Sequence, residues 1–278
     1  SYKNIYKVKM AMSPKRMFID FEFGQMHVRM SEKNPNQNKH SLYCIHQSPS
    51  SSVIYNPIIM ELGSSRFVAA GDTPGFGESD ELKFLPEISD YANAHAGVLD
   101  NLDITHKVDL MGYFTGSKIA IALALQRPEK IRKLILFGIP IYTDKELSDE
   151  KKLYRKDEYS WDGKHLMNWW THLRKNTPEK YPIELFVSHF SEIQRGGVNS
   201  WWGHRAAFNY KPELHLPKLS HPVLVFCTED PQGYKSLKAE KLINNCTLVN
   251  LPFKGQGALD LHTNTITNYI LDFLDSDS

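Results

Sequence analysis

Residues 108–117, which read VDLMGYFTGS, decide the fold of this chain. The mostly apolar residues at the start of the stretch predict a buried strand, and the apolar spacing that follows it predicts a helix. Gly112 and Gly116 flank the short link between the two. Glycine is needed at such positions because side chains there would collide with neighbouring backbone. The stretch therefore predicts a strand, a tight turn over 112–116 with Phe114 at its centre, and a helix.

Strand and helix signals alternate on both sides of this turn. Strands are predicted over 17–30 (a hairpin around Gly24), 41–46, 66–70, 131–141, 221–228 and 247–251. Helices are predicted over 88–102, 117–126 and 263–274. Because strands that alternate with helices form parallel sheets with right-handed crossovers, we predict an α/β fold with a mostly parallel central sheet flanked by helices.

Residues 144–217 break this alternation, because they show helix-like patches and no strand pattern. We predict that they form a helical cap inserted into a core made of residues 1–143 and 218–278. All five tryptophans of the chain fall in this insertion: Trp161, Trp169, Trp170, Trp201 and Trp202. Most of them are expected to pack the cap onto the sheet, but their concentration also suits a lid that encloses a flat or apolar ligand. We take all of them except Trp161 as candidate substrate-binding residues.

The composition is that of an ordinary globular protein. The 278 residues, 41% hydrophobic and 23% charged, suffice for one large α/β domain with an insertion. The 33 basic and 32 acidic residues leave a net charge of +1, which gives no electrostatic attraction for nucleic acid or an anionic membrane. Apolar runs are far shorter than the roughly 20 residues that span a bilayer, and residues 1–16 lack the apolar stretch of a signal peptide. We therefore expect a cytoplasmic protein without a nucleic-acid or membrane partner.

The sequence carries no pattern for a metal or a cofactor. Four histidines of the insertion, His165, His172, His189 and His204, have spacings that match no metal-binding template. The Gly-Ser-Lys at 116–118 lacks the upstream spacing of a phosphate-binding loop. Three cysteines are too few and too scattered for a disulfide framework or a zinc cluster. We expect no metal and no cofactor.

Several motifs occur in the order typical of one family. Residues 72–80, DTPGFGESD, resemble the D-x-P-G-x-G-x-S-D loop of α/β-hydrolases, and residues 108–117 resemble their nucleophile elbow. Residues 127–129, RPE, resemble the end of the helix that follows the elbow, and residues 222–226 before Asp230 resemble the strand that delivers the catalytic acid. The resemblance covers nearly the whole chain outside the cap. It implies the α/β-hydrolase fold with an inserted cap.

The same resemblance shows a departure at the catalytic positions. Phe114 stands where the family has its serine, so Gly-Tyr-Phe-Thr-Gly replaces Gly-x-Ser-x-Gly. Phenylalanine has no nucleophilic atom, and no acyl-enzyme can form on it. Gln256 or Ala258 takes the place of the family's histidine, while Asp230 is the best candidate for the acid. The resemblance therefore implies a degenerate catalytic triad.

The residues around the turn have alternative roles. Phe114 either forms the floor of a ligand pocket or fills a site that has lost its activity. Thr115 is expected to offer its backbone N–H to a substrate oxygen, and the alternative is that its hydroxyl is a displaced nucleophile. Asp230 is either a general base or a solvated loop carboxylate. Gln256 is placed to hydrogen-bond a carbonyl or enol of the substrate.

The segment His46-Gln47-Ser48-Pro49 stands where many relatives have His-Gly-x-Pro. Gln47 adds an amide that both donates and accepts hydrogen bonds, so it is a candidate substrate-binding residue. Ser48 either hydrogen-bonds the substrate or hydrogen-bonds backbone amides of its own loop. His46 either orients the loop or acts as a general base, and we count it with Asp230 and Gln256 as a candidate catalytic residue.

Three functions follow from these residues. The first is an enzyme that acts non-covalently on a small hydrophobic carbonyl compound under the cap, by cyclisation, isomerisation, decarboxylation or retro-aldol cleavage. The second is an inactive pseudo-hydrolase that binds or senses a small molecule. The third, ranked lowest, is residual hydrolysis by water activated at Asp230. We favour the first, with a small hydrophobic ligand as partner and a homodimer as a possible assembly.

Overall fold

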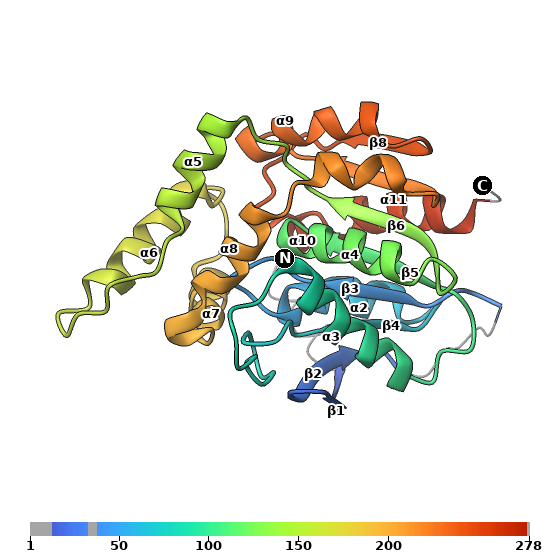
Figure 1. Ribbon diagram of the computed structural model, residues 1–278, viewed down its shortest axis with the longest axis horizontal. Helices are drawn as coiled ribbons and strands as arrows, with labels where there is room; N and C mark the ends of the chain where they lie inside the picture. The colour runs from blue at the N-terminus through green and yellow to red at the C-terminus, as the bar shows by residue number, and fades with distance from the viewer. Residues whose placement is uncertain (1–12, 33–37, 277–278) are drawn as a thin grey trace.

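A computed structural model of the protein describes residues 13–32 and 38–276 (Figure 1). Most of residues 1–16, which were searched for the apolar stretch of a signal peptide, lie outside the described residues. The centre is an eight-stranded sheet with the order β1-β2-β4-β3-β5-β6-β7-β8. Its strands are β1 (Lys15–Phe21), β2 (Gly24–Met30), β3 (Leu42–Ile45), β4 (Val68–Gly71), β5 (Val108–Tyr113), β6 (Ile131–Phe137), β7 (Val223–Cys227) and β8 (Cys246–Asn250).

The mostly parallel sheet predicted from the sequence is confirmed. Strands β4, β3, β5, β6, β7 and β8 pair in parallel, whereas β1 and β2 form the antiparallel hairpin expected around Gly24. Every residue of β3, β4, β5 and β7 is buried, which explains why these strands are almost entirely apolar in sequence, with Asp109 of β5 as the charged exception. The predicted strand over 131–141 is shorter in the structure, since β6 ends at Phe137 and Gly138 follows with a positive φ of 76°.

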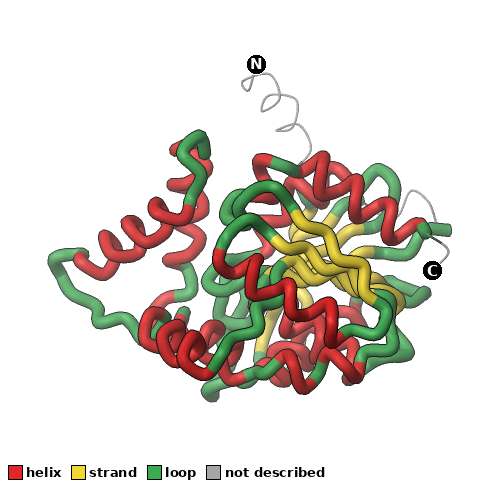
Figure 2. Tube along the Cα trace, turned by 90° about the horizontal axis from the view of Figure 1, so that it is seen from above, coloured by secondary structure: helices red, strands yellow, loops and turns green. Residues whose placement is uncertain are grey.

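Helices cover both faces of the sheet (Figures 1 and 2). On one face α3 (Ile88–Asn101) and α4 (Thr115–Gln126) share a core with one set of strand side chains. On the other face α2 (Asn56–Leu62) and α11 (Thr263–Asp275) pack against the alternate set. Short helices α9 (Pro231–Ser236) and α10 (Ala258–Leu261) follow β7 and β8. None of the helices within the described residues has the length and apolar character needed to cross a membrane.

Four α-helices lie between β6 and β7, and residues 144–217 contain no strand. They are α5 (Asp144–Leu153), α6 (Lys164–Asn176), α7 (Ile183–Gln194) and α8 (Trp201–Asn209). Figures 1 and 2 both show α5 and α6 projecting sideways from the sheet. Helix α8 contacts both α5 and α4, so it joins this helical segment to the core.

Candidate functional site

The predicted turn lies between β5 and α4, with Phe114 at its apex. Phe114 has a φ of 45° and a ψ of −99°, and it is the only non-glycine residue with a positive φ in the described part of the chain. Holding a residue in such a region costs of order 1–3 kcal/mol. Gly116, two residues farther on, lies against the sheet: a Cβ there would lie 1.9 Å from the carbonyl oxygen of Ile45, at the end of β3. The first turn of α4 therefore rests directly on the backbone of β3.

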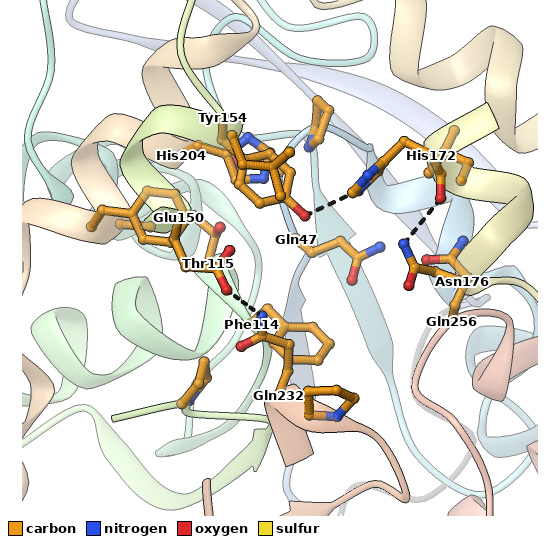
Figure 3. A pocket seen from close by; sticks show the side chains of 18 of the residues that line it. Gln47, Phe114, Thr115, Glu150, Tyr154, His172, Asn176, His204, Gln232 and Gln256 are labelled. Atoms are coloured by element: carbon orange, nitrogen blue, oxygen red, sulfur yellow. Dashed lines mark hydrogen bonds between the residues drawn. The ribbon is translucent and has the colours of Figure 1, made fainter. Parts of the chain in front are cut away.

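The ring of Phe114 fills the space between two backbone segments. A Cβ at Gly138, just after β6, would lie 2.6 Å from the ring, and one at Gly255 would lie 3.5 Å from it. The ring also contacts Tyr113 edge-on, with centroids 5.2 Å apart. Phe114 lines a cavity as well as filling this space (Figure 3). Gly138 thus provides the room that a phenylalanine needs at the turn.

The carboxylate of Asp230 is held by hydrogen bonds from backbone N–H groups, and is not a solvated loop carboxylate. One oxygen, Oδ1, accepts hydrogen bonds from the backbone N–H groups of Gln232 and Gly233, at 3.0 and 2.9 Å, and so caps α9. The other, Oδ2, accepts from the N–H of Gly255 at 2.8 Å. Asp230 thereby fixes the loop that places Gln256 in the cavity wall.

His46 lies behind the cavity wall and does not line it. Its Nε2 accepts a hydrogen bond from the N–H of Thr73 at 2.8 Å, so its Nδ1 carries the proton and donates to the carbonyl of Gln47 at 2.8 Å. Burial lowers the pKa of His46, which favours this neutral form. Both ring nitrogens are therefore engaged in orienting the loop, an arrangement that does not suit a general base.

Gln47 and Ser48 both lie in the cavity wall. Ser48 also contacts the cap, because a Cβ at Gly203 of α8 would fall 2.1 Å from its hydroxyl oxygen. Thr115 is buried at the start of α4 and lines the cavity too. The N–H groups of a helix's first turn have no partner within the helix, so this end of α4 is suited to hold an oxygen of a ligand.

The loop that begins at Asp72 is held by a buried carboxylate. Asp72 accepts hydrogen bonds from Nδ1 of His27 at 2.8 Å, the N–H of Ser52 at 2.7 Å and the N–H of Glu78 at 3.0 Å. Burial alone would raise its pKa, but these hydrogen bonds and the nearby His46 lower it to about 2. Asp72 is therefore a structural residue, in agreement with its place at the head of the motif.

We expect Asp72 to govern the acid stability of the fold. Its pKa of about 2 lies below the value near 3.9 of an unfolded aspartate, so its contribution is present above about pH 4 and is lost as the pH falls through about 2. At pH 7 this contribution is about 2 kcal/mol. Urea unfolding from pH 2.5 to 7 should show Asp72→Ala less stable by at least that amount at pH 7, with a flatter acid limb. Asp20→Ala, at an exposed carboxylate, is the control, and an unchanged acid limb in Asp72→Ala would contradict the assignment.

The cavity has a volume of about 360 Å³ and lies between the turn and the inserted helices (Figure 3). Its cap side comes mainly from α5, α6 and α8. Tyr154 stacks on His204, with centroids 4.2 Å apart, and its hydroxyl lies 3.2 Å from Nε2 of His172. Burial lowers the pKa of both histidines, that of His204 to about 3, so both are neutral near pH 7.

Of the four candidate tryptophans, only Trp169 lines the cavity. Its Nε1 donates to Asp157 at 2.5 Å. Trp170 instead packs against two phenylalanines of α7, with ring centroids 4.6 and 5.2 Å away. Trp201 and Trp202 are half-buried outside the cavity wall. Helical periodicity explains the difference, because neighbouring residues on a helix point to different faces.

Sequence reasoning did not identify several polar residues of the cavity. Tyr142 donates to Oε1 of Gln232 at 2.7 Å, and Nε2 of Gln232 donates to Glu150 at 2.9 Å. Lys118 also lines the cavity, and its pKa is lowered to about 8 by burial. The signal for Lys118 was available, since a lysine inside an otherwise apolar helix is rarely buried without a reason. In the described residues, no three His, Cys, Asp or Glu side chains are grouped so as to hold a metal ion.

Comparisons with known proteins agree with this architecture. Residues 41–231, more than half of the chain, match the family model described as alpha/beta hydrolase fold. An 82-residue segment is 43% identical to the 2-hydroxymuconate semialdehyde hydrolase of Pseudomonas sp. (strain CF600), and it spans 29% of each chain.

Solved structures are similar over nearly the whole length. A thermophilic esterase from Thermogutta terrifontis superposes with a TM-score of 0.77 at 18% identity, covering 94% of this chain and 98% of its own. The enol-lactonase from Burkholderia xenovorans LB400 gives 0.74 at 16% identity, covering 91% and 97%. At these identities the likeness concerns the fold, while the family match covers the turn, the cap and the acid-bearing strand together. This chain belongs to the α/β-hydrolase-fold family.

Proposed function

We propose that this chain is an enzyme that acts without an acyl-enzyme intermediate on a small hydrophobic carbonyl compound, bound between the strained turn and the cap. The observation that carries the proposal is Phe114 at the apex of that turn, next to a cavity lined by the amides of Gln47 and Gln256. A chain that had lost all use for the turn would gain stability by relaxing it, since the strain costs of order 1–3 kcal/mol. The position instead keeps its geometry without its nucleophile.

The remaining groups suit a reaction in which negative charge develops on oxygen. A carbonyl oxygen at the start of α4 would face the N–H of Thr115 and the N-terminal end of the helix. The amides of Gln47 and Gln256 would add donors from two other loops. Such donors stabilise an enolate, which is common to isomerisation, decarboxylation, cyclisation and retro-aldol cleavage.

We assign the movement of the proton to His172. It is neutral near pH 7 because burial lowers its pKa, and its Nε2 lies 3.2 Å from the hydroxyl of Tyr154. Asp230 is a positioning residue in this scheme, because all three of its hydrogen bonds go to backbone N–H groups of the loops that form the cavity wall. The semialdehyde in the name of one similar protein is itself a carbonyl compound, which supports this substrate class.

An alternative function is a binding protein that senses a small molecule. The observation in its favour is the ring of Phe114, which fills the space between the turn and the loop at Gly255. An enzyme needs a group whose replacement abolishes turnover while binding persists. A binder needs only shape, so replacing a cavity residue would alter affinity alone.

Exchange of α-protons in D₂O tests the proposal without knowledge of the natural substrate. We expect the wild-type protein to accelerate deuterium incorporation next to the carbonyl of 4-phenylbutan-2-one, measured by NMR. Gln256→Ala should lower the exchange rate by about 10²-fold, since one donor to a developing oxyanion is worth that much, and should change the dissociation constant of the ketone far less. Trp161→Ala, at a fully exposed cap residue, is the matched control. Binding of the ketone without exchange would favour the sensor.

A further inference from the structure

A buried lysine lines the same cavity one helical turn beyond Phe114. Lys118 is only 3% exposed, and its Nζ donates a hydrogen bond to the carbonyl of Ala207 at 2.6 Å. Ala207 lies in the last turn of α8, where carbonyls have no partner within the helix. The lysine therefore connects α4 of the core to the end of a cap helix.

Several neighbours of Lys118 stabilise its ammonium form and so partly offset the effect of burial. The negative end of the α8 dipole faces the Nζ, and the ring centroids of Tyr142 and Phe208 lie 5.8 and 6.0 Å from it. Burial lowers the pKa of Lys118 to about 8, while the carboxylate of Glu213 acts in the opposite direction. At pH 7 about nine in ten molecules still carry the charge.

No carboxylate of the described residues forms a salt bridge with this ammonium. The two carboxylates in the cavity wall are engaged elsewhere: Glu150 accepts from the Gln232 amide, and Asp230 accepts from three backbone N–H groups. The cap histidines nearest the cavity, His172 and His204, are held neutral by burial. A buried charge is usually paired, and an ammonium has three donors, of which Ala207 takes one.

We infer that Lys118 binds a carboxylate of the substrate, so that the natural ligand is a carbonyl compound that also carries an acid group. The carbonyl would lie at the start of α4 and the carboxylate one turn farther along the same helix, beneath Tyr142 and Phe208. This inference rests on the proposed function, because it adds a second anchoring group to the same ligand. Without that role, Lys118 would serve only to hold α8 against α4.

Two probes that differ only in the carboxylate test the inference by calorimetric binding at pH 7. We expect 4-phenyl-2-oxobutanoate to bind the wild-type protein at least about 10-fold more tightly than 4-phenylbutan-2-one, as one charge-assisted hydrogen bond allows. Lys118→Met should abolish this preference, and Lys118→Arg should retain most of it. Lys254→Met is the matched control, because Lys254 is the exposed lysine of the same cavity wall and should leave the preference unchanged.

The wild-type protein alone gives a second test that needs no variant. Its preference for the keto acid should decline as the pH rises above about 8, where Lys118 loses its charge. A preference that is absent in the wild type, that survives Lys118→Met, or that is lost in Lys254→Met would overturn the inference. So would reduction by cyanoborohydride of a covalent imine on Lys118, because the residue would then act as an amine nucleophile. Failure of the proposed function looks different: neither probe would exchange its α-protons, whatever their relative affinities.

Discussion

Replacing Gly116 by alanine is expected to destabilise the protein by about 3 kcal/mol or more, because no flexible group can make room for the added methyl. A Cβ at this position would lie 1.9 Å from the carbonyl oxygen of Ile45, 2.6 Å from its carbonyl carbon and 2.8 Å from the carbonyl oxygen of His46. All three atoms are backbone atoms at the end of β3, a fully buried central strand. The helix would have to separate from the sheet to accommodate the side chain.

Gly97→Ala is the matched control for this substitution. Gly97 lies inside α3, and a Cβ there would meet only one side-chain atom, at an ordinary 3.9 Å. Alanine in a helix interior is more favourable than glycine by roughly 0.5–1 kcal/mol, so this variant should be as stable as the wild type or more so. Urea unfolding of both variants gives the comparison. A Gly116→Ala protein with wild-type stability would mean that α4 does not rest on β3 as described.

The turn shows how far the sequence could be read. The apolar pattern and two glycines four residues apart placed a strand, a tight turn and a helix, and the structure shows that a side chain at either glycine would collide with backbone. Asp72 and Asp230 could be located by motif for a similar reason, because each accepts at least one hydrogen bond from a backbone N–H of the segment that follows it. Backbone geometry that depends on contacts within a short segment can therefore be predicted from the residues of that segment.

The cap side of the cavity could not be predicted in the same way. Trp169 and Trp170 are neighbours of one residue type, yet one lines the cavity and the other packs on α7. Which of them faces inward depends on how α6 lies against α7 and the core, and no local pattern records that. The sequence could show that Lys118 is unusual in an apolar helix, but its partner Ala207, like the partner Glu150 of Gln232, belongs to a segment distant in the chain and could not be predicted.

The prediction with the largest effect on activity concerns the three positions at which relatives carry the catalytic triad, which are 114, 230 and 256 in this chain. Phe114→Ser combined with Gln256→His should produce hydrolysis of short-chain p-nitrophenyl esters at least about 10²-fold above either single variant, because nucleophile and base act as a unit. The scaffold for this already exists. The turn holds residue 114 at the strained φ, and Asp230 is fixed within 2.8 Å of the backbone N–H of Gly255, the neighbour of residue 256. Removal of the ring also opens the space between residue 114 and that loop, so a histidine at 256 has room to turn toward both partners.

The two single variants separate the contributions and act as the controls. Phe114→Ser alone supplies a hydroxyl without a base, and Gln256→His alone supplies a base that faces a phenyl ring, so neither should exceed the wild type by much. Loss of the partly buried ring is expected to cost about 2 kcal/mol of stability, so the activity is compared only between variants whose circular dichroism shows a folded protein. If the wild type hydrolysed the esters and none of the substitutions changed the rate, the nucleophile would lie elsewhere in the cavity. Position 114 would then not be the centre of the reaction site. Ester hydrolysis by the double variant, with none by the wild type, would instead mean that the fold still supports serine-hydrolase chemistry. The wild type would then lack this activity because it lacks the serine and the histidine, and not because the site has collapsed.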